Sequence, residues 1–323
     1  YYRSLASHAE AARLRLAEWV GWFRPREVNV IPLIEDSASL MAADSIVRPY
    51  ASHVGRRAVR VFIARSDPAL NYGLPCAVAL AKVALAKLAR LSEEGVETYP
   101  IIGVGSLPFR GGLSPHRLTA FLEEYRGVYT VTVQSSLKYD HPAQVAEQTV
   151  RELRRRLPSG EALELSDEEA LVRAVDKLRE AYAEVVEGLA PLVNEVSMYV
   201  PQRRARRLHI GLFGYSRGVR GVTLPRAIPF TCSMYSLGIP PELLGLRKLD
   251  ELSEEEWRAL EECYVNLRLD VEEASHYASL RNLELLREAD AFKRFSRALK
   301  LVEEDLEAVE HQLGVKPGPK SSA

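Results

Sequence analysis

The sequence predicts an α/β fold with parallel strands and many α-helices, an arrangement that suits a (βα)8 barrel. Short apolar segments without polar alternation are typical of parallel strands that are buried on both faces. Helical segments lie between them, as the crossovers of a parallel sheet require. Polar side chains also follow the ends of these strands, which is where βα barrels build their active sites.

Composition excludes several classes of protein. The chain has 323 residues, of which 47% are hydrophobic and 27% are charged, so a sizeable core is expected rather than disorder. Its formal net charge of -1 provides no global field that favours nucleic acid or an anionic membrane. No apolar run is long enough for a membrane span. Three cysteines without Cys-x-x-Cys spacing favour a cytoplasmic setting, and the low content of Asn and Gln favours a heat-adapted protein.

Six short apolar segments are the candidate strands. They are residues 28–34, 59–64, 99–104, 128–133, 208–213 and 222–230. A complete barrel needs eight strands. Two strands are therefore expected either before residue 1 or within segments that we interpret as helical.

Helices are predicted where apolar residues recur every three or four positions. This spacing marks residues 5–23, 74–91 and 166–199. Ser166 and Glu169 have the spacing of a capping box at the start of the third segment.

The C-terminal third is also predicted to be helical. Ser253 and Glu256 form a second expected capping box, which opens a helix that runs to about residue 267. Residues 270–313 give one or two further helices, and Gly314 is expected to end the last of them.

Polar residues at the strand ends are the candidate functional residues. Glu35 follows the first strand, Asp67 follows the second, and Gln134 follows the fourth. In a barrel these groups converge on one face. Two carboxylates without a nearby His or Cys cluster favour a hard cation, Mg²⁺ or Mn²⁺. The alternative is that each acid caps a helix or lies in a loop.

A glycine-rich loop, residues 103–112, follows the third strand. Glycines let backbone N–H groups approach an anion, and Arg110 within the loop adds contacts to phosphate or carboxylate. The loop has the motif of neither a P-loop nor a dinucleotide-binding fingerprint. A plain turn is the alternative interpretation.

Arginines are the remaining candidates. Arg226 lies within Leu-Pro-Arg-Ala-Ile-Pro, where a cation needs an anionic partner, either a structural acid or a substrate. The basic run at residues 203–207 has no interleaved aromatic residues, so we interpret it as a solvated face rather than a nucleic-acid site.

Four segments occur in an order that resembles the phosphoenolpyruvate carboxylase family, in its shorter archaeal form. They are residues 30–35 (VIPLIE), 64–73 (ARSDPALNYG), 109–112 (FRGG) and 225–229 (PRAIP). The resemblance covers most of residues 25–247. It implies a phosphoenolpyruvate/pyruvate-type barrel, usually a homotetramer, that makes oxaloacetate and phosphate from phosphoenolpyruvate and bicarbonate.

The resemblance also assigns roles to charged residues. It implies that Glu35 and Asp67 hold the divalent metal, Mg²⁺ or Mn²⁺, which binds the substrate and stabilises the pyruvate enolate. It implies that Arg110 stabilises the carboxyphosphate that forms when bicarbonate attacks the phosphoryl group. Arg217 and Arg226 are expected to bind phosphate or carboxylate oxygens.

Further positions are assigned to substrate binding by the same resemblance. Gly111, Gly112 and Gln134 belong to the substrate-binding set. Leu33 and Phe62 match positions that line a small pocket for CO₂, which would keep water away from the enolate.

The chain departs from the longer bacterial and plant enzymes at three positions near the site. Ile102 and Val104 stand where those enzymes carry a His and an Arg in the glycine loop, and Leu70 replaces a Lys. The family's catalytic His-Pro motif precedes the segment that corresponds to Glu35. We therefore expect this chain to lack that His and to be inactive in isolation.

The expected organisation is one catalytic barrel domain over residues 1–323. It comprises an N-terminal helix at 1–27, the strands and active site at 28–247, and a helical region at 248–323. Two other functions stay open: another Mg-dependent lyase of the same barrel superfamily, or a non-catalytic helical scaffold. Bicarbonate-dependent phosphate release distinguishes the carboxylase from the other lyase, and an absence of metal binding would indicate the scaffold.

Overall fold

The computed structural model describes residues 29–201 and 217–319. The chain divides into two compact units, Tyr1–Ile31 and Pro32–Ala323, and the description below concerns the second. The predicted helix at 5–23, the predicted strand at 208–213 and the basic run at 203–207 lie outside the described residues.

A parallel sheet of four strands forms in the order in which the strands occur in the chain. The strands are β1 (Leu33–Ile34), β2 (Ala58–Ala64), β3 (Glu97–Gly103) and β4 (Thr130–Val131). Their register pairs Leu33 with Phe62, Phe62 with Ile101, and Ile101 with Thr130. Four of the six predicted strands are thus confirmed, although β1 and β4 are shorter than expected.

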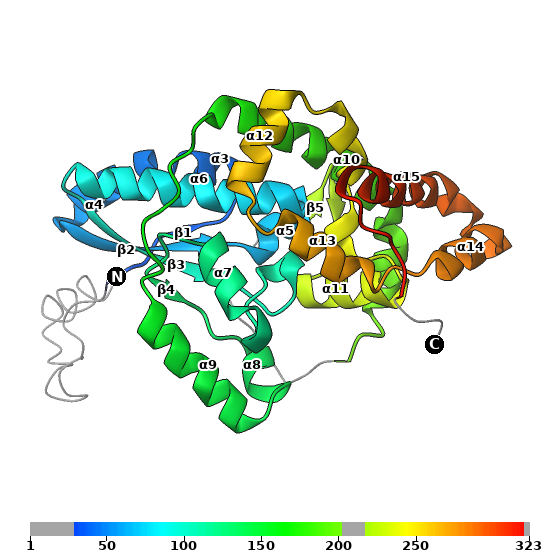
Figure 1. The fold of residues 1–323 in the computed structure, drawn as a ribbon, viewed down its shortest axis with the longest axis horizontal. Helices are drawn as coiled ribbons and strands as arrows, with labels where there is room; N and C mark the ends of the chain where they lie inside the picture. Colours follow the sequence, from blue (N-terminus) through cyan, green and yellow to red (C-terminus); the bar gives the residue numbers. More distant parts are fainter. Residues whose placement is uncertain (1–28, 202–216, 320–323) are drawn as a thin grey trace, which may run out of the picture. The chain divides into compact units, whose positions relative to one another are not determined.

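Helices connect the parallel strands. The connections contain α3 (Ser37–Met41), α4 (Ala43–Val54), α5 (Ser66–Tyr72), α6 (Leu74–Glu93), η1 (Pro108–Arg110), η2 (Pro115–Arg117) and α7 (Leu118–Glu124). Helix α6 consists mostly of Ala, Leu and Val and is buried along most of its length. It packs on β2 and β3, and α4 packs on β2 (Figure 1). The crossovers that the sequence predicts are therefore present.

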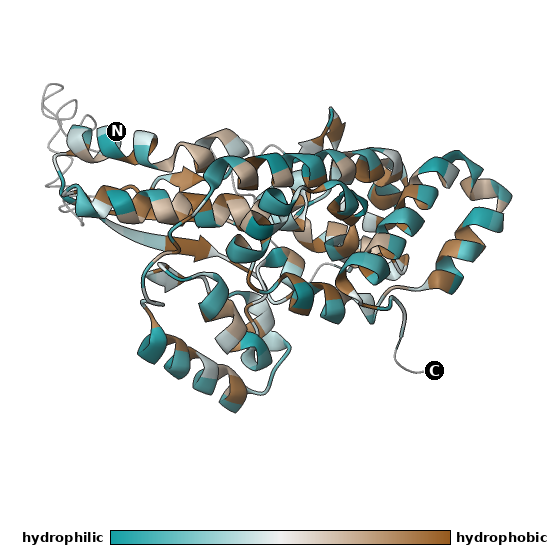
Figure 2. Ribbon diagram, turned by 45° about the horizontal axis from the view of Figure 1, so that its top comes forward, coloured by the Kyte–Doolittle hydropathy of each residue, from teal (hydrophilic) through white to brown (hydrophobic). Residues whose placement is uncertain are grey.

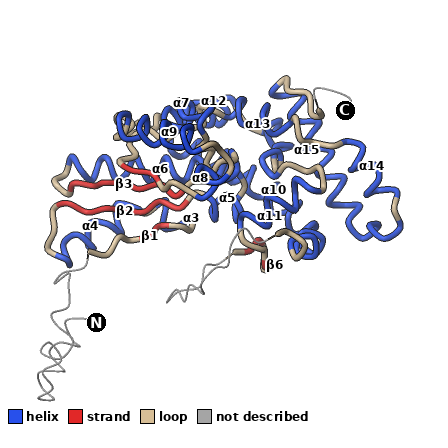
Figure 3. Tube along the Cα trace, turned by 90° about the horizontal axis from the view of Figure 1, so that it is seen from below, coloured by secondary structure: helices blue, strands red, loops and turns tan. Residues whose placement is uncertain are grey.

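The rest of the described chain is mostly helical. It contains α8 (Ser135–Tyr139), α9 (Ala143–Arg156), α10 (Glu168–Ser197), α11 (Ala227–Ser236), η3 (Pro241–Leu243), η4 (Leu246–Glu251), α12 (Glu254–Cys263), α13 (Leu267–Ser275), α14 (Leu280–Glu288), η5 (Asp290–Phe295) and α15 (Ser296–Leu313), with a hairpin of β5 (Gly218–Val219) and β6 (Val222–Thr223). The long helix α10 packs against α6, α11, α12 and α15. Figure 3 shows α10, α11, α14 and α15 gathered to one side of the four-stranded sheet, with the β5–β6 hairpin near α11.

Two of the predicted helix ends are confirmed. Ser253 and Glu256 form the expected capping box of α12, and Gly314, in the left-handed conformation, ends α15. Helix α12 stops at Cys263, a few residues earlier than predicted, and α13 starts at Leu267.

Two local predictions are wrong. Helix α10 is capped by Asp167, whose side chain accepts from the Ala170 N–H, while Ser166 bonds to Glu262 instead. Residues 222–230 do not form one strand, because α11 begins at Ala227. Pro229 fits there because the first turn of a helix needs no N–H from it.

One hydrophobic core joins the sheet to the helices. Fully buried side chains come from β2, α6, α10 and α15, among them Ile63, Leu88, Val185 and Leu299. Figure 2 shows hydrophobic residues toward the ends of the strands and mixed hydrophobic and hydrophilic patches along the helices, as expected where each helix buries one side. The described residues thus form an α/β fold that is mostly helical around a parallel four-stranded sheet.

Candidate active site

The predicted strand-end residues lie along one edge of the sheet. Glu35 follows β1, Asp67 lies in the first turn of α5 after β2, Arg110 ends η1 after β3, and Gln134 follows β4. Because the four strands are parallel neighbours, their carboxyl ends meet at the same edge. The structure therefore brings together residues that are up to about a hundred positions apart in the chain.

Two carboxylates and one arginine form the first half of the site. Both oxygens of Asp67 accept from Arg217, the Nε and Nη2 atoms each at 3.1 Å. Burial raises the pKa of the Glu35 carboxyl, the negative charge of Asp67 raises it further, and Arg217 partly offsets this rise. Glu35 and Asp67 are therefore electrostatic neighbours that repel each other beside the Arg217 guanidinium.

This donor set fits a hard divalent cation. Mg²⁺ is usually bound by one or two carboxylates, with water and substrate oxygens completing its coordination. Glu35 and Asp67 offer two carboxylates whose mutual repulsion a cation would relieve. In the described residues no cluster of three or more His, Cys, Asp and Glu could hold a metal alone. Two carboxylates alone would leave coordination positions of such a cation to water or other oxygen ligands.

The glycine loop forms the second half of the site. The Gly111 and Gly112 N–H groups donate to the carbonyls of Pro108 and Leu107, both at 2.9 Å. These N–H groups are therefore used inside the loop. What the loop offers to an anion is the Arg110 guanidinium, whose Nη2 atom donates to Gln134 Oε1 at 2.7 Å.

A buried arginine to which sequence analysis assigned no role supports this loop. Arg65, at the end of β2, is 1% exposed. It donates to the Tyr125 hydroxyl at 2.7 Å and to the carbonyls of Phe109 and Pro108 at 3.3 and 3.4 Å. In the sequence, the only sign of this role is an Arg that directly follows an apolar strand and precedes Ser66. Its partners cannot be found from local patterns, because they lie more than 40 positions away.

The apolar pair predicted for the CO₂ pocket is adjacent in the sheet. Leu33 and Phe62 are register partners on β1 and β2, and Leu33 is 44% exposed. A Cβ atom on Gly103 of β3 would lie 2.6 Å from the Phe62 ring. Only glycine at 103 therefore lets this ring lie beside β3.

Arg226 is exposed at the N-terminus of α11. Within residues 29–201 and 217–319, no hydrogen bond or ion pair involves its side chain. The structural ion pair that sequence analysis weighed is thus not found among these residues. The structure also provides no contact that joins Arg226 to Asp67 or Arg110.

Comparisons with known proteins identify the family. A family model described as phosphoenolpyruvate carboxylase matches residues 2–321. The chain belongs to the phosphoenolpyruvate carboxylase family. Curated relatives with that name include one from Caldivirga maquilingensis, 45% identical over 306 residues, which are 94% of this chain and 60% of the relative. Another, from Picrophilus torridus, is 41% identical over 297 residues, 92% of this chain and 58% of the relative.

A third carboxylase relative, from Methanospirillum hungatei, is 48% identical over 239 residues, which are 74% of this chain and 49% of the relative. The chain spans about 60% of the length of the first two relatives. No helix among the described residues is both long and apolar enough to cross a membrane.

The tight glycine loop of this carboxylase-family chain gives a testable prediction. Gly111 has φ +113°, and a Cβ atom there would lie 2.5 Å from Val104 Cγ1. Gly111→Ala should therefore lower the free energy of unfolding by about 2–4 kcal/mol, measured by urea denaturation. Gly95→Ala is the matched control, since Gly95 has φ +98° but no atom near the added methyl. Equal losses in the two variants would contradict the packing argument.

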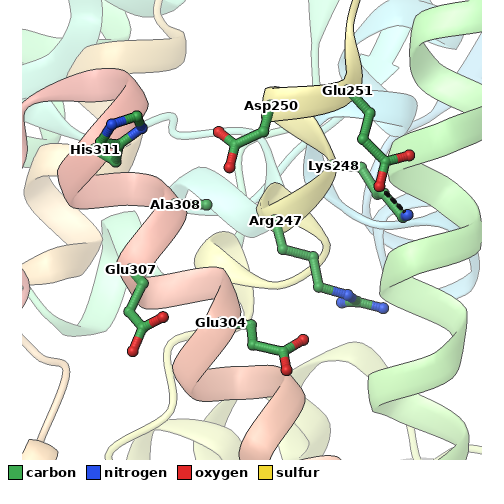
Figure 4. Close-up of a pocket in the computed structure, with 8 residues that line it drawn as sticks. All are labelled: Arg247, Lys248, Asp250, Glu251, Glu304, Glu307, Ala308 and His311. Atoms are coloured by element: carbon green, nitrogen blue, oxygen red, sulfur yellow. Dashed lines mark hydrogen bonds and ion pairs between the residues drawn. The ribbon is translucent and has the colours of Figure 1, made fainter.

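A separate hollow of about 560 Å³ lies between η4 and α15 (Figure 4). It is lined by Arg247, Lys248, Asp250, Glu251, Glu304, Glu307, Ala308 and His311. None of the predicted carboxylase site residues lines it. Its cations already have partners, since Lys248 pairs with Glu251 and Arg247 pairs with Asp305 and Glu184.

Proposed function

We propose that this chain carries the metal and phosphoenolpyruvate site of a phosphoenolpyruvate carboxylase, which forms oxaloacetate and phosphate from phosphoenolpyruvate and bicarbonate. The observation that carries this proposal is the row of Glu35, Asp67, Arg110 and Gln134 at the ends of four neighbouring parallel strands. The names of the archaeal relatives support the same activity.

Charge complementarity gives each residue a role. Glu35 and Asp67 would hold Mg²⁺ or Mn²⁺, and the bound cation would supply positive charge that stabilises the anionic oxygens of the substrate. Arg217, already held by Asp67, would bind a phosphate or carboxylate oxygen beside the cation. Arg226 has no described anionic partner and would provide a further contact of this kind.

The reaction needs two stages, in which Arg110 and the apolar pair have different tasks. A bicarbonate oxygen attacks phosphorus, the bond between phosphorus and the enol oxygen breaks, and carboxyphosphate and the pyruvate enolate result. Arg110, oriented by Gln134, would stabilise the charge on the transferred group. Carboxyphosphate then yields phosphate and CO₂, and the enolate carbon attacks CO₂. Leu33 and Phe62 would exclude water, which would otherwise protonate the enolate.

We further propose that the four strands belong to a (βα)8 barrel. Strands β1 and β4 are the two edges of the described sheet, and a barrel closes such edges with further strands. The family resemblance also favours a homotetramer, and the composition favours a cytoplasmic, heat-adapted protein. Sedimentation equilibrium of the purified chain tests the tetramer directly.

Calorimetric titration tests the site. Phosphoenolpyruvate titrated into the chain should bind only when Mg²⁺ is present. Arg110→Ala should weaken this binding by about 10- to 100-fold, the effect of losing a charged hydrogen bond. Arg151→Ala is the control, because Arg151 lies on the exposed face of α9. Metal-independent binding, or equal binding by the Arg110 variant, would contradict the assignment.

A coupled assay with the same protein tests the reaction. Oxaloacetate and phosphate formation that depends on bicarbonate would support the carboxylase. Pyruvate formation that does not require bicarbonate would indicate another lyase. Metal-dependent binding with little turnover is expected if a catalytic group lies outside this chain.

A further inference from the structure

A fully buried carboxylate contacts the glycine-rich loop from a distant part of the chain. Glu242, in η3, is 0% exposed, and its Oε1 atom accepts from the Phe109 N–H at 3.2 Å. Phe109 immediately precedes Arg110. The two partners are 133 positions apart in sequence, so this contact joins η3 to the loop that carries the arginine.

The Phe109 ring is held as firmly as its backbone. The ring is fully buried and stacks on Phe230 of α11, with ring centroids 5.7 Å apart and planes inclined by 23°. Arg65 meanwhile donates to the Phe109 carbonyl. Donor, acceptor and ring of the residue before Arg110 are therefore all fixed by buried groups.

Packing alone does not explain a glutamate at position 242, because its side chain is fully buried. The pKa of its carboxyl is raised to about 7, mainly by burial and to a lesser extent by the charge of Asp270 on α13. The backbone N–H groups of Glu242 itself and of Phe109, and the hydroxyl of Tyr235 on α11, partly offset this rise. The Tyr182 ring of α10 also lies within its field. A buried carboxyl without a cation costs more free energy than an apolar side chain would. The hydrogen bond from the Phe109 N–H to Glu242 offsets part of this cost, and an apolar side chain could not accept it.

We propose that Glu242 is a positioning residue for Arg110, which holds the glycine loop by its Phe109 N–H so that the guanidinium stays beside Gln134. This role rests on the function proposed above, because its benefit is the binding of the anionic substrate by Arg110. Glu242 touches no substrate and acts through the backbone of the loop.

The hold on the loop depends on the charge of Glu242. An ionised carboxylate accepts a stronger hydrogen bond than a neutral carboxyl. Because the carboxyl changes charge near neutral pH, the loop is held more firmly at pH 8 than at pH 6. Glu242→Gln keeps an oxygen acceptor at every pH and so removes this dependence.

Hydrogen exchange of the full chain tests the contact without reference to activity. Amide exchange in residues 105–112, corrected for the intrinsic pH effect, is measured at pH 6 and pH 8 in the wild type and in Glu242→Gln. The wild type should exchange about tenfold more slowly at pH 8 than at pH 6. This factor corresponds to the difference in strength between a hydrogen bond to a charged acceptor and one to a neutral acceptor. Glu242→Gln should show no such difference.

Two further variants separate positioning from general stability. Glu242→Leu fills the space without an acceptor and should raise loop exchange about tenfold or more at pH 8. Asp305→Asn alters another buried carboxyl with a raised pKa, which accepts from Gly245 and Arg247 and not from the loop. It should leave exchange at 105–112 unchanged. A pH difference that persists in Glu242→Gln, or an equal change in Asp305→Asn, would overturn the proposal.

The affinity for phosphoenolpyruvate shows whether the contact of Glu242 with the loop affects the proposed substrate site. The affinity for phosphoenolpyruvate with Mg²⁺ should be several-fold lower in Glu242→Gln than in the wild type at pH 8, and equal at pH 6. Titration of the substrate itself affects both proteins alike and cancels in this comparison. A wild type that binds no phosphoenolpyruvate would refute the proposed function, whereas unchanged loop exchange would refute the role of Glu242. The two failures are therefore distinguishable.

Discussion

Asp67→Ala is expected to weaken the metal-dependent binding of phosphoenolpyruvate by about 100-fold or more. The variant removes one of two carboxylates available to the cation, and it also leaves Arg217 without the partner that holds both its Nε and Nη2 atoms. Truncating one partner of a charged contact in a complex typically costs about 2–5 kcal/mol, so losing the contact of Asp67 with the cation should lower affinity by about 100-fold or more. Calorimetric titration at saturating Mg²⁺ measures the change.

Asp36→Ala is the matched control on the same edge of the sheet. The Asp36 carboxylate accepts from the N–H and the hydroxyl of Ser39 and so caps α3, which lowers its pKa. Its loss should cost about 1 kcal/mol of stability and leave metal-dependent binding intact. If the two variants bind equally well, Asp67 has no special role in the site.

Glu124→Leu is expected to cause the largest loss of stability. Lys82 on α6 lies 2.8 Å from Glu124 on α7, and their side chains are only 4% and 3% exposed. The second Glu124 oxygen accepts from the Asn266 N–H at 2.7 Å. Removing the acid strands a buried ammonium group, which should lower the free energy of unfolding by about 3–5 kcal/mol. Urea denaturation at pH 7 measures this loss.

The double variant Lys82→Met/Glu124→Leu tests the cause of that loss. Replacing both charges by apolar groups should recover most of the stability, because no unpaired charge stays buried. Glu152→Leu is the surface control, since the pair of Glu152 with Arg155 on α9 is exposed and should contribute less than about 1 kcal/mol. A double variant no more stable than Glu124→Leu would contradict this explanation.

The sequence predicts the row of site residues because the responsible pattern is local. A short apolar strand followed by a polar side chain can be identified within ten residues, and parallel pairing then places successive strand ends together. Glu35, Asp67 and Gln134 were identified in this way and lie at neighbouring strand ends in the structure. The roles assigned to these residues are still predictions that await the titrations above.

Contacts that support the site were not predictable from local patterns. The carboxylate of Glu242 and the amide of Phe109 are 133 positions apart, so no periodicity connects them.

The predicted cap of α10 is wrong for a different reason. Ser166 and Asp167 are adjacent, and both residue types favour N-cap positions. Tertiary contact decided between them, because Ser166 bonds to Glu262 and leaves Asp167 to cap the helix.

The most direct test of the central claim is a crystal structure of the chain with Mn²⁺ and phosphoenolpyruvate, with anomalous diffraction locating the metal. We predict a manganese peak between the carboxylates of Glu35 and Asp67, with the substrate phosphate or carboxylate beside Arg217 or Arg110. A peak in the hollow between η4 and α15, or substrate bound away from the strand ends, would contradict the site described here.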